Sequence, residues 1–357
     1  MSMTPMSYEC IECLLRHMDA NTRIQISNRC PSIRALEKRV PLKIKALKLM
    51  RYGVELNNVA YSIGIIRKYK EGRIPNTVAR NNENGGVEYE VDRYGIEDIS
   101  DATTITPGDV EIVRPGMDWG RRNPVRIDEA EMIRSLEDRI QMEALKHLTT
   151  VLFGGRSSPI YVKEMTLNCL NRQECVIRLP YGLKFHVQCL TLPFALGNKL
   201  EALAPIIHET SYPLKFLSID VYSERDVTNP VVQSAEELEV YIRLGNPLQI
   251  LQILPNDRVR LIVHPDVFSD MERIVRDWIA ANRPVGAVHI FEMNAEPVFL
   301  DEMENILKRF NGVVIDEENV IIPMNDAVQL KVTYGPFPEF SPKSNWAFKL
   351  LNEAFQH

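Results

Sequence analysis

The sequence lacks the features that mark several large classes of protein. No apolar run approaches the eighteen residues of a membrane-spanning helix, and the first residues lack the basic and apolar regions of a secretory signal. The six cysteines, at positions 10, 13, 30, 169, 175 and 189, are few and irregularly spaced for 357 residues. Reduced thiols are the simplest interpretation, so we expect a cytoplasmic or nuclear protein with no membrane partner.

Motifs for chemistry are also scarce. Cys10 and Cys13 form a CxxC without a second pair, so zinc is not expected. The segment 154–158 lacks the Gly-Lys-Ser/Thr of a phosphate-binding loop and predicts a turn. His186 and Cys189 have odd spacing within a strand-like segment, which places them on opposite faces. We therefore expect a binding protein without a cofactor or metal, and not an enzyme; a hydrolase with an unrecognised site is the least favoured alternative.

Composition is that of an ordinary globular chain with more than one core. Hydrophobic residues make up 45% and charged residues 25% of the 357 positions. The formal net charge of −6 argues against a nucleic-acid-binding surface spread over the whole protein. Basic residues gather between positions 38 and 73, where we expect the exposed face of an edge strand.

The first forty residues predict three short helices. Pro5 suits a helix entry and Ser7 an N-cap. An apolar face then repeats at three- and four-residue spacing through Tyr8, Ile11, Leu14, Leu15 and Met18. A second helix is expected around 22–28, with Ile24 and Ile26 as its apolar residues, and a third at 33–40. Helices this short must pack on the following domain or on a partner.

Residues 42–126 predict a small β-rich region that ends in an irregular connection. The segments 42–49 and 59–66 are rich in β-forming residues, and 87–91 alternates between apolar and acidic residues. Residues 77–80 are a candidate partner for the last of these in a hairpin. We expect a small antiparallel sheet over 42–95.

Residues 127–357 predict one long helix followed by β/α repeats. The helix is expected over 127–152, and an apolar pattern then recurs in strand-like copies that end at Leu167, Leu192, Ile219 and Ile290. The longer interval between 219 and 261 leaves room for an additional element. Capping boxes at 234–237 and 269–272 predict two helices. A strand and a helix at a period in the twenties are typical of leucine-rich repeats, here degenerate because no asparagine ladder is present. A compact α/β domain with a mixed sheet is the alternative.

The opening segment of the chain resembles a known protein family. The segment from Pro5 to Val40 resembles a divergent F-box, and SYECIECLLRHMDANTRIQISNRCPSIRALEKRVPLKIKALKL is similar to the opening of the nematode F-box C proteins. YSIGIIRKYKEG and NGGVEYEVDRYG fit the same family, in which an uncharacterised domain follows the motif. An ordinary F-box opens with Leu-Pro, whereas this chain has Thr4-Pro5.

The resemblance implies a substrate-recognition subunit of a Skp1–cullin–F-box ubiquitin ligase. It would dock on a Skp1-like adaptor and hold an unknown protein target in its C-terminal domain. The adaptor-binding residues, matched to the F-box pattern and the apolar face, would be Pro5, Met6, Ile11, Leu14, Leu15, Ile24 and Ile26.

The sequence therefore predicts an α+β or α/β chain in three parts. These are an F-box-like helical module at 1–41, a small β-rich region at 42–126, and a helix plus β/α repeat-like target-binding domain at 127–357. The alternative function is a non-catalytic, repeat-type interaction scaffold without a role in ubiquitin ligation, which the altered Thr4-Pro5 opening favours.

Overall fold

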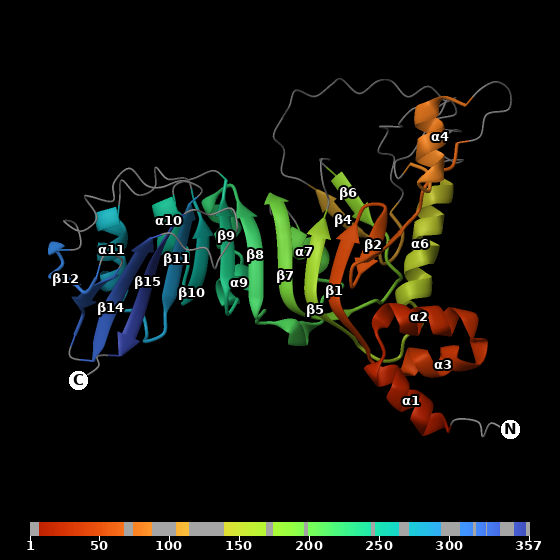
Figure 1. Cartoon of the computed structure of the whole chain (residues 1–357), viewed down its shortest axis with the longest axis horizontal. Coiled ribbons are helices and arrows are strands. Elements are labelled where there is room, and N and C mark those ends of the chain that lie inside the picture. The colour runs from red at the N-terminus through yellow and green to blue at the C-terminus, as the bar shows by residue number, and fades with distance from the viewer. Residues whose placement is uncertain are drawn as a thin grey trace. The chain divides into compact units, whose positions relative to one another are not determined.

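The structure is a computed structural model that describes residues 7–67, 74–87, 105–113, 139–168, 174–195, 199–243, 247–263, 271–293, 308–316, 319–325, 327–335 and 346–354 (Figure 1). The chain divides into two compact units. The N-terminal unit comprises residues 1–188 and 197–211, and the C-terminal unit comprises residues 189–196 and 212–357. Each unit contains a mixed sheet with helices, in agreement with the predicted mixture of helices and strands.

The N-terminal unit begins with the three predicted helices: α1 (Tyr8–His17), α2 (Ala20–Arg29) and α3 (Pro31–Arg39). Ser7 Oγ accepts the Cys10 N–H at 3.3 Å, and Asp19 Oδ1 accepts the Asn21 N–H at 2.9 Å. These side chains cap α1 and α2, while Pro31 opens α3, where its missing N–H costs nothing. We call residues 7–41 the helical module.

The sheet of this unit has the order β3-β2-β1-β5. Strand β1 (Leu42–Met50) pairs antiparallel with β2 (Gly53–Leu56), which pairs antiparallel with β3 (Val59–Ser62). On its other side, β1 pairs in parallel with β5 (Ile160–Asn168), starting at Leu42 opposite Ile160. The antiparallel sheet predicted for 42–95 is therefore only one edge of a mixed sheet, because its first strand takes a partner 118 residues further along the chain.

The predicted hairpin at 77–80 is wrong. These residues lie in α4 (Asn76–Glu83), where Val78 is buried. Asn82 fixes the helix in place because its side-chain amide accepts the Arg67 N–H at 3.0 Å and donates to the Arg67 carbonyl at 2.8 Å. Val87 instead bridges Ile65, and residues 88–91 lie outside the described residues. Tertiary hydrogen bonds of this kind leave no trace in local periodicity.

The remaining elements of the N-terminal unit include the long predicted helix. It is present as α6 (Arg139–Phe153), and the rest of the predicted span, 127–138, lies outside the described residues. Strands β4 (Val110–Val113) and β6 (Glu174–Ile177) form a separate antiparallel pair. Helix α7 (Lys199–Leu203) and the 3₁₀ turn η1 (Glu209–Ser211) complete this unit.

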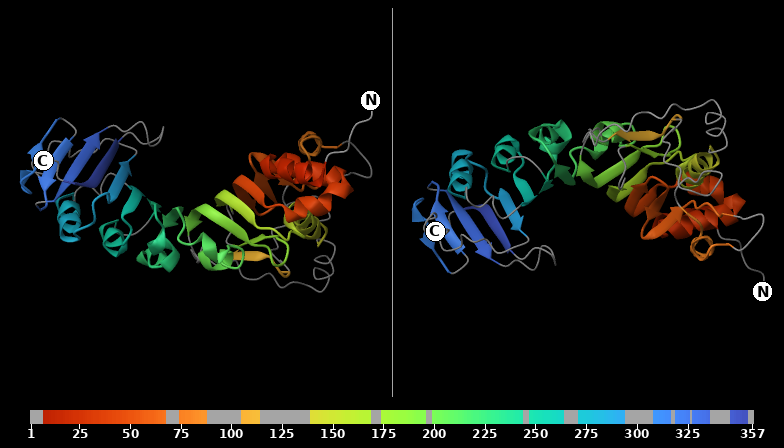
Figure 2. Two further views of the ribbon diagram at one scale, coloured as in Figure 1. Left: turned by 90° about the horizontal axis from the view of Figure 1, so that it is seen from below. Right: turned by 90° about the horizontal axis from the view of Figure 1, so that it is seen from above.

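The C-terminal unit is built on parallel strands that follow one another in the sheet. Strand β7 (Phe185–Ala195), whose residues 189–195 belong to this unit, is followed by β8 (Phe216–Val221), β9 (Leu238–Ile242), β10 (Arg258–Ile262) and β11 (Val288–Met293). Helices α8 (Glu224–Val227), α9 (Pro230–Ser234), α10 (Pro247–Ile253) and α11 (Met271–Ala280) connect them. The four helices lie on one face of this sheet (Figure 2), as expected when successive right-handed crossovers advance in one direction.

Antiparallel strands complete this sheet beyond β11. They are β15 (Trp346–Ala354), β14 (Val328–Gly335), β13 (Asn319–Pro323) and β12 (Val313–Val314), in that order. The parallel part matches the strand copies seen in the sequence, and the antiparallel part makes the whole sheet mixed. The mixed sheet agrees with the alternative interpretation of an α/β domain, whereas the leucine-rich-repeat interpretation stays a prediction.

Strand β9 is the additional element in the long interval between 219 and 261. The helix predicted from the capping box at 234–237 is wrong, because Ser234 ends α9 and a strand begins at Leu238. Leu238 and Val240 are buried apolar residues, and Glu239 between them is also buried, on the opposite face of the strand, where its carboxylate accepts the Ser218 hydroxyl at 2.8 Å. Side chains that alternate between two faces are typical of a strand. In the folded chain this strand pattern outweighs the local capping-box signal for a helix. The second capping box, at 269–272, begins in residues outside those described.

Two rows of apolar side chains run across the parallel strands and form the core. In the first row the register places Leu190, Leu217, Leu238, Val259 and His289 side by side. In the second it places Leu192, Ile219, Val240, Leu261 and Phe291. All are buried. His289 thus occupies a position that the four preceding strands fill with leucine or valine.

Candidate functional site

The helical module divides the predicted adaptor-binding residues into different environments. Leu15 and Ile24 are 2% and 3% exposed, so they belong to the core of the N-terminal unit and present nothing to a partner. Leu14 is 49% exposed, and Ile11 and Ile26 are half-buried. Pro5 and Met6 lie outside the described residues. The apolar residues of α1 therefore lie in two environments: Leu15 is buried in the core, whereas Leu14 is half exposed to solvent.

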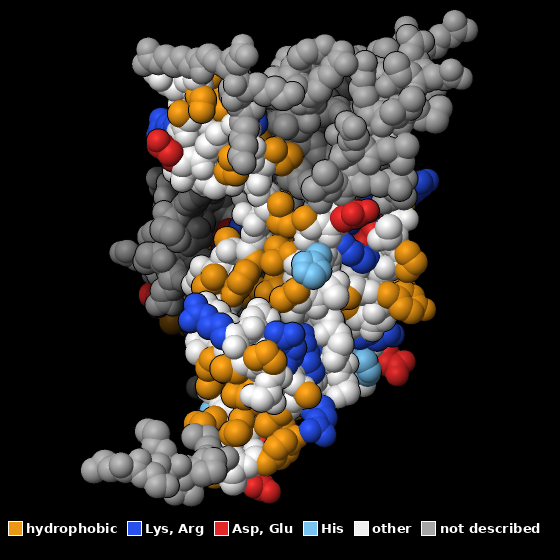
Figure 3. Space-filling model, turned by 90° about the vertical axis from the view of Figure 1, so that its right-hand side faces the viewer, with side chains coloured by type: hydrophobic (Ala, Val, Ile, Leu, Met, Phe, Trp, Pro, Cys, Tyr) orange, Lys and Arg blue, Asp and Glu red, His pale blue; other side chains and the backbone are white. Residues whose placement is uncertain are grey.

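The outward side of α1 carries an apolar strip, the α1 stripe, made of Tyr8, Ile11, Leu14 and Met18. Tyr8, Ile11 and Leu14 lie three residues apart along one side of the helix, and Met18 follows as the C-cap, where the backbone is extended. Tyr8 and Leu14 are each about half exposed, and Ile11 packs against the buried cluster of Leu15, Leu36 and Val40. In the lower part of Figure 3, where the module lies, hydrophobic side chains alternate with Lys and Arg.

A buried arginine joins the helices of the module to one another. Arg23 is 1% exposed, and its Nε donates to Glu37 Oε1 at 2.8 Å. Its two terminal nitrogens donate to the carbonyls of Leu15, Glu37, Val40 and Pro41. The Leu15 carbonyl lies in the last turn of α1, those of Glu37 and Val40 lie at the end of α3, and that of Pro41 lies directly before β1, so one side chain joins three segments.

The same carboxylate binds a second arginine from the loop after α6. Arg156 Nη2 donates to Glu37 Oε1 at 2.7 Å, and both side chains are almost fully buried. Burial lowers the pKa of Arg23, and the charge of Glu37 opposes this effect. No motif in the sequence distinguishes Arg23 from the other arginines of the module. The sequence signal that indicates its burial is its position on the same face of α2 as Ala20, Ile24 and Ser27, which are all buried.

The cysteines of the module do not form a metal site or a buried pair. Cys10, Cys13 and Cys30 are free and exposed. Within the described part of the chain, no cluster of three or more His, Cys, Asp or Glu side chains could hold a metal ion.

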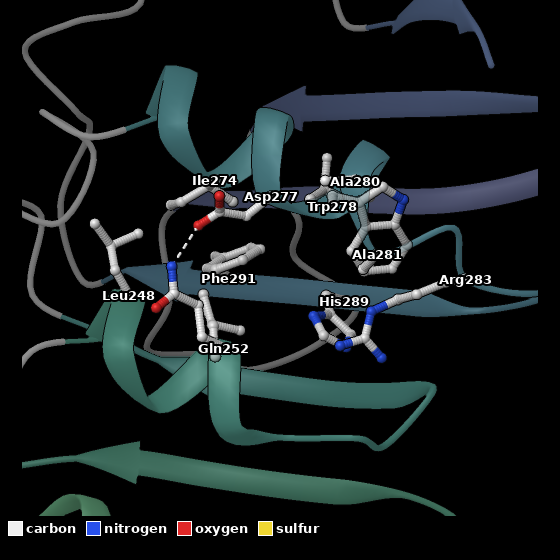
Figure 4. A pocket seen from close by; sticks show the side chains of 12 residues that line it. Leu248, Gln252, Ile274, Asp277, Trp278, Ala280, Ala281, Arg283, His289 and Phe291 are labelled. Carbon is white, nitrogen blue, oxygen red and sulfur yellow. Dashed lines mark hydrogen bonds between the residues drawn. The ribbon is translucent and has the colours of Figure 1, made fainter.

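The C-terminal unit has a cavity of about 340 Å³ between α10 and α11, over β11 and β15 (Figure 4). Its walls are mainly apolar, and Leu248, Ile274, Trp278, Phe291 and Leu350 contribute most of them. Gln252 of α10 donates to Asp277 of α11 at 2.8 Å, which ties the two helices together across the cavity. A cavity of this size, with few polar groups, suits an apolar side chain of a bound polypeptide.

His289 lines this cavity as a neutral group. Burial lowers its pKa to about 3; the positive charge of Arg283 adds to the effect, and a hydrogen bond with the Asn256 carbonyl opposes it. Its Nε2 lies 3.1 Å from that carbonyl oxygen and the ring meets Trp278 edge-on. Arg283 donates to the carbonyls of Leu254 and Asn256 at 3.0 and 2.8 Å. His289 therefore acts as a structural donor rather than as an acid or base at neutral pH.

The comparisons with known proteins concern the middle of the chain. A family model described as a domain of unknown function, DUF3557, matches residues 141–295. No curated protein and no solved structure matches the chain. No helix among the described residues is both long and apolar enough to cross a membrane.

The family match confirms part of the sequence resemblance. An uncharacterised domain of nematode type is present over residues 141–295, whereas no family model covers the helical module. The match includes α10, α11 and β11, so all residues of the apolar cavity except Leu350 lie within it. The cavity is therefore a feature of the matched domain, and the α1 stripe lies outside it.

Proposed function

We propose that this protein is a substrate-receptor subunit of a Skp1–cullin–F-box type ubiquitin ligase. The helical module would dock on a Skp1-like adaptor, and the C-terminal unit would hold a protein target close to the ligase. The chain itself would break no bond, since proximity alone supplies the catalytic benefit.

The α1 stripe is the observation that carries this proposal. A helix of a small module normally buries its apolar residues, yet Tyr8 and Leu14 remain about half exposed next to Ile11. Exposed arginines at positions 16, 29, 34 and 39 surround the helices. An apolar strip with a basic rim favours a protein partner that offers a hydrophobic groove with acidic margins.

Leu14→Asp should weaken adaptor binding at least about tenfold, or about 1.4 kcal/mol, because it places a charge in the centre of the desolvated interface. The measurement is co-purification and titration of the full-length chain with a Skp1-like adaptor. Val313→Asp is the matched control, since Val313 is a similarly exposed apolar residue in the C-terminal unit. It should leave adaptor binding unchanged. A well-folded wild-type chain that forms no adaptor complex would rule out the proposal.

The target would bind in the cavity between α10 and α11. Its apolar walls and neutral histidine favour a hydrophobic side chain, and Asp277 at the Gln252 bridge favours a basic residue next to it. Burial of a large side chain in such a pocket is the usual basis of a binding hot spot.

The scaffold function is the second candidate, and a specific observation favours it. Helix α2 is tied to the edge of the sheet because Asn21 donates to the Leu56 carbonyl at 3.0 Å and accepts from the Tyr61 hydroxyl at 2.9 Å. A module whose purpose is to cover a sheet end would make such contacts. The adaptor titration separates the two functions, because a scaffold would form no adaptor complex that Leu14→Asp could weaken.

A further inference from the structure

The N-terminal unit contains a second cavity whose character is the opposite of the first. It has a volume of about 260 Å³ and lies between the loop 153–160 and the loop 180–184, with His186 and His208 on its wall. The charged or titratable groups along it are Arg156, Lys184, Tyr181, His186 and His208, and no carboxylate is among its lining residues. Neither the adaptor surface nor the apolar cavity shares these residues.

Thr210 holds the rings of the two histidines in place through their Nδ1 atoms. Their rings stack at 4.1 Å, and Thr210 Oγ1 lies 2.9 Å from Nδ1 of each. The Thr210 N–H donates to His208 Nδ1 at 3.2 Å. A neutral His208 must therefore carry its proton on Nε2, on the far side of the ring from Thr210. One threonine thus fixes the position of both rings and leaves His208 Nε2–H as a donor.

Arg156 supplies fixed positive charge at the same cavity. Its side chain is 3% exposed, and although Nη2 binds Glu37, its buried Nε has no hydrogen-bond partner among the described residues. Glu37 is shared with Arg23, so the three buried charges sum to one positive charge. Buried donors without acceptors are rare in proteins because they lose their hydrogen bond to water. The exposed Lys184 adds a second cation at the rim.

Aromatic side chains complete the surroundings. Tyr161 lies against His186 with ring centroids 4.8 Å apart, and Tyr181 at the rim is 83% exposed. Burial, followed by the proximity of His208, lowers the pKa of His186, so its ring is neutral at pH 7 and keeps a single N–H. The cavity therefore combines cations, neutral donors and exposed aromatic surface; no carboxylate is among its lining residues, and the nearby Glu37 is shared between Arg156 and Arg23.

We propose that this cavity binds a phosphate monoester, with Lys184, His208 and the hydroxyl-rich loop 156–158 as its contacts. A phosphoryl group has the right chemistry because it accepts several hydrogen bonds and carries about two negative charges at neutral pH. The proposal does not depend on adaptor docking and concerns a separate part of the chain. The phosphate can belong to a free small molecule or to a phosphorylated residue of a polypeptide.

The test is an NMR titration of the full-length chain, following the ring resonances of His186 and His208. Inorganic phosphate is the first probe, and a phosphoserine peptide with its unphosphorylated counterpart is the second. Both phosphates should shift the two rings, and Lys184→Met should weaken binding about fivefold to tenfold. Lys163→Met is the matched control, since Lys163 is an exposed lysine of β5 that does not line the cavity. It should not change the affinity.

The two probes distinguish the sources of the phosphate. A peptide that binds no more tightly than inorganic phosphate identifies a free small anion, whereas a clear preference for the phosphoserine peptide identifies a modified polypeptide. His208→Gln, which keeps a side-chain donor, should retain more affinity than His208→Ala. The proposal is overturned if neither probe shifts the histidine rings of the folded wild type, or if Lys184→Met and Lys163→Met bind alike.

Discussion

Arg23→Met should destabilise the N-terminal unit by about 3–5 kcal/mol, the range found when one partner of a buried ion pair is removed. The substitution keeps much of the side-chain volume but leaves the carbonyls of Leu15, Val40 and Pro41 without their donor. Urea denaturation measures the change in unfolding free energy. Hydrogen exchange of the amides in α1–α3 then shows where the unit opens. Exchange should rise first in these helices because they lose their common anchor.

Arg16→Met is the matched control for this substitution. Arg16 also pairs with a glutamate, Glu12 at 2.6 Å, but both side chains are substantially exposed. A surface pair at this helical spacing contributes about 0.5 kcal/mol or less. If the two variants were equally stable, the buried Arg23 would not anchor the module.

Acid should destabilise the C-terminal unit through His289. The pKa of His289 in the folded chain is about 3, against an ordinary value near 6.5, so below pH 6.5 the unfolded chain binds a proton that the folded chain rejects. The stability is complete above pH 6.5 and is lost as the pH falls toward 3. Between pH 7.5 and pH 5, we expect a loss of about 2 kcal/mol from this group alone.

The prediction is tested by the difference in unfolding free energy between the wild type and His289→Gln at both pH values. The glutamine cannot titrate but can still donate to the Asn256 carbonyl, so the wild-type advantage should shrink by about 2 kcal/mol at pH 5. Phe291→Leu, in the neighbouring row of the same strand, serves as the control. Its cost should be equal at both pH values. A constant difference for His289→Gln would show that His289 does not titrate on unfolding.

The sequence predicted those elements whose pattern is local. The three short helices, β1, β3, the described part of α6 and most parallel strands of the C-terminal unit follow from apolar spacing and caps. Strand β9 was missed because Ser234 and Glu237 match a capping box, and only its pairing with β8 and β10 makes Leu238–Ile242 a strand. The parallel pairing of β1 with β5 could not be seen because it joins residues far apart in the chain.

The candidate sites were predictable to a smaller extent. Periodicity shows which residues share one side of a helix, but it does not show whether that side packs on the same chain or on another. Leu14 and Leu15 are adjacent in the sequence, yet one is half exposed and the other is core. The cavities depend on side chains brought together by the sheet register, and neither was predicted. His186 was noted only for its unsuitable spacing from Cys189, whereas its partners in the structure are Thr210 and His208.

The pairing of β1 with β5 has a consequence for synthesis on the ribosome. The helical module and β1 emerge first, but the strand that covers the edge of β1 and the arginine that completes the Glu37 cluster follow more than a hundred residues later. Until then β1 offers an open edge of the kind that chaperones and neighbouring chains can capture. A chain interrupted before residue 160 would carry every residue of the α1 stripe without the support that holds it in place. The proposed docking would then be withheld from chains that end before β5.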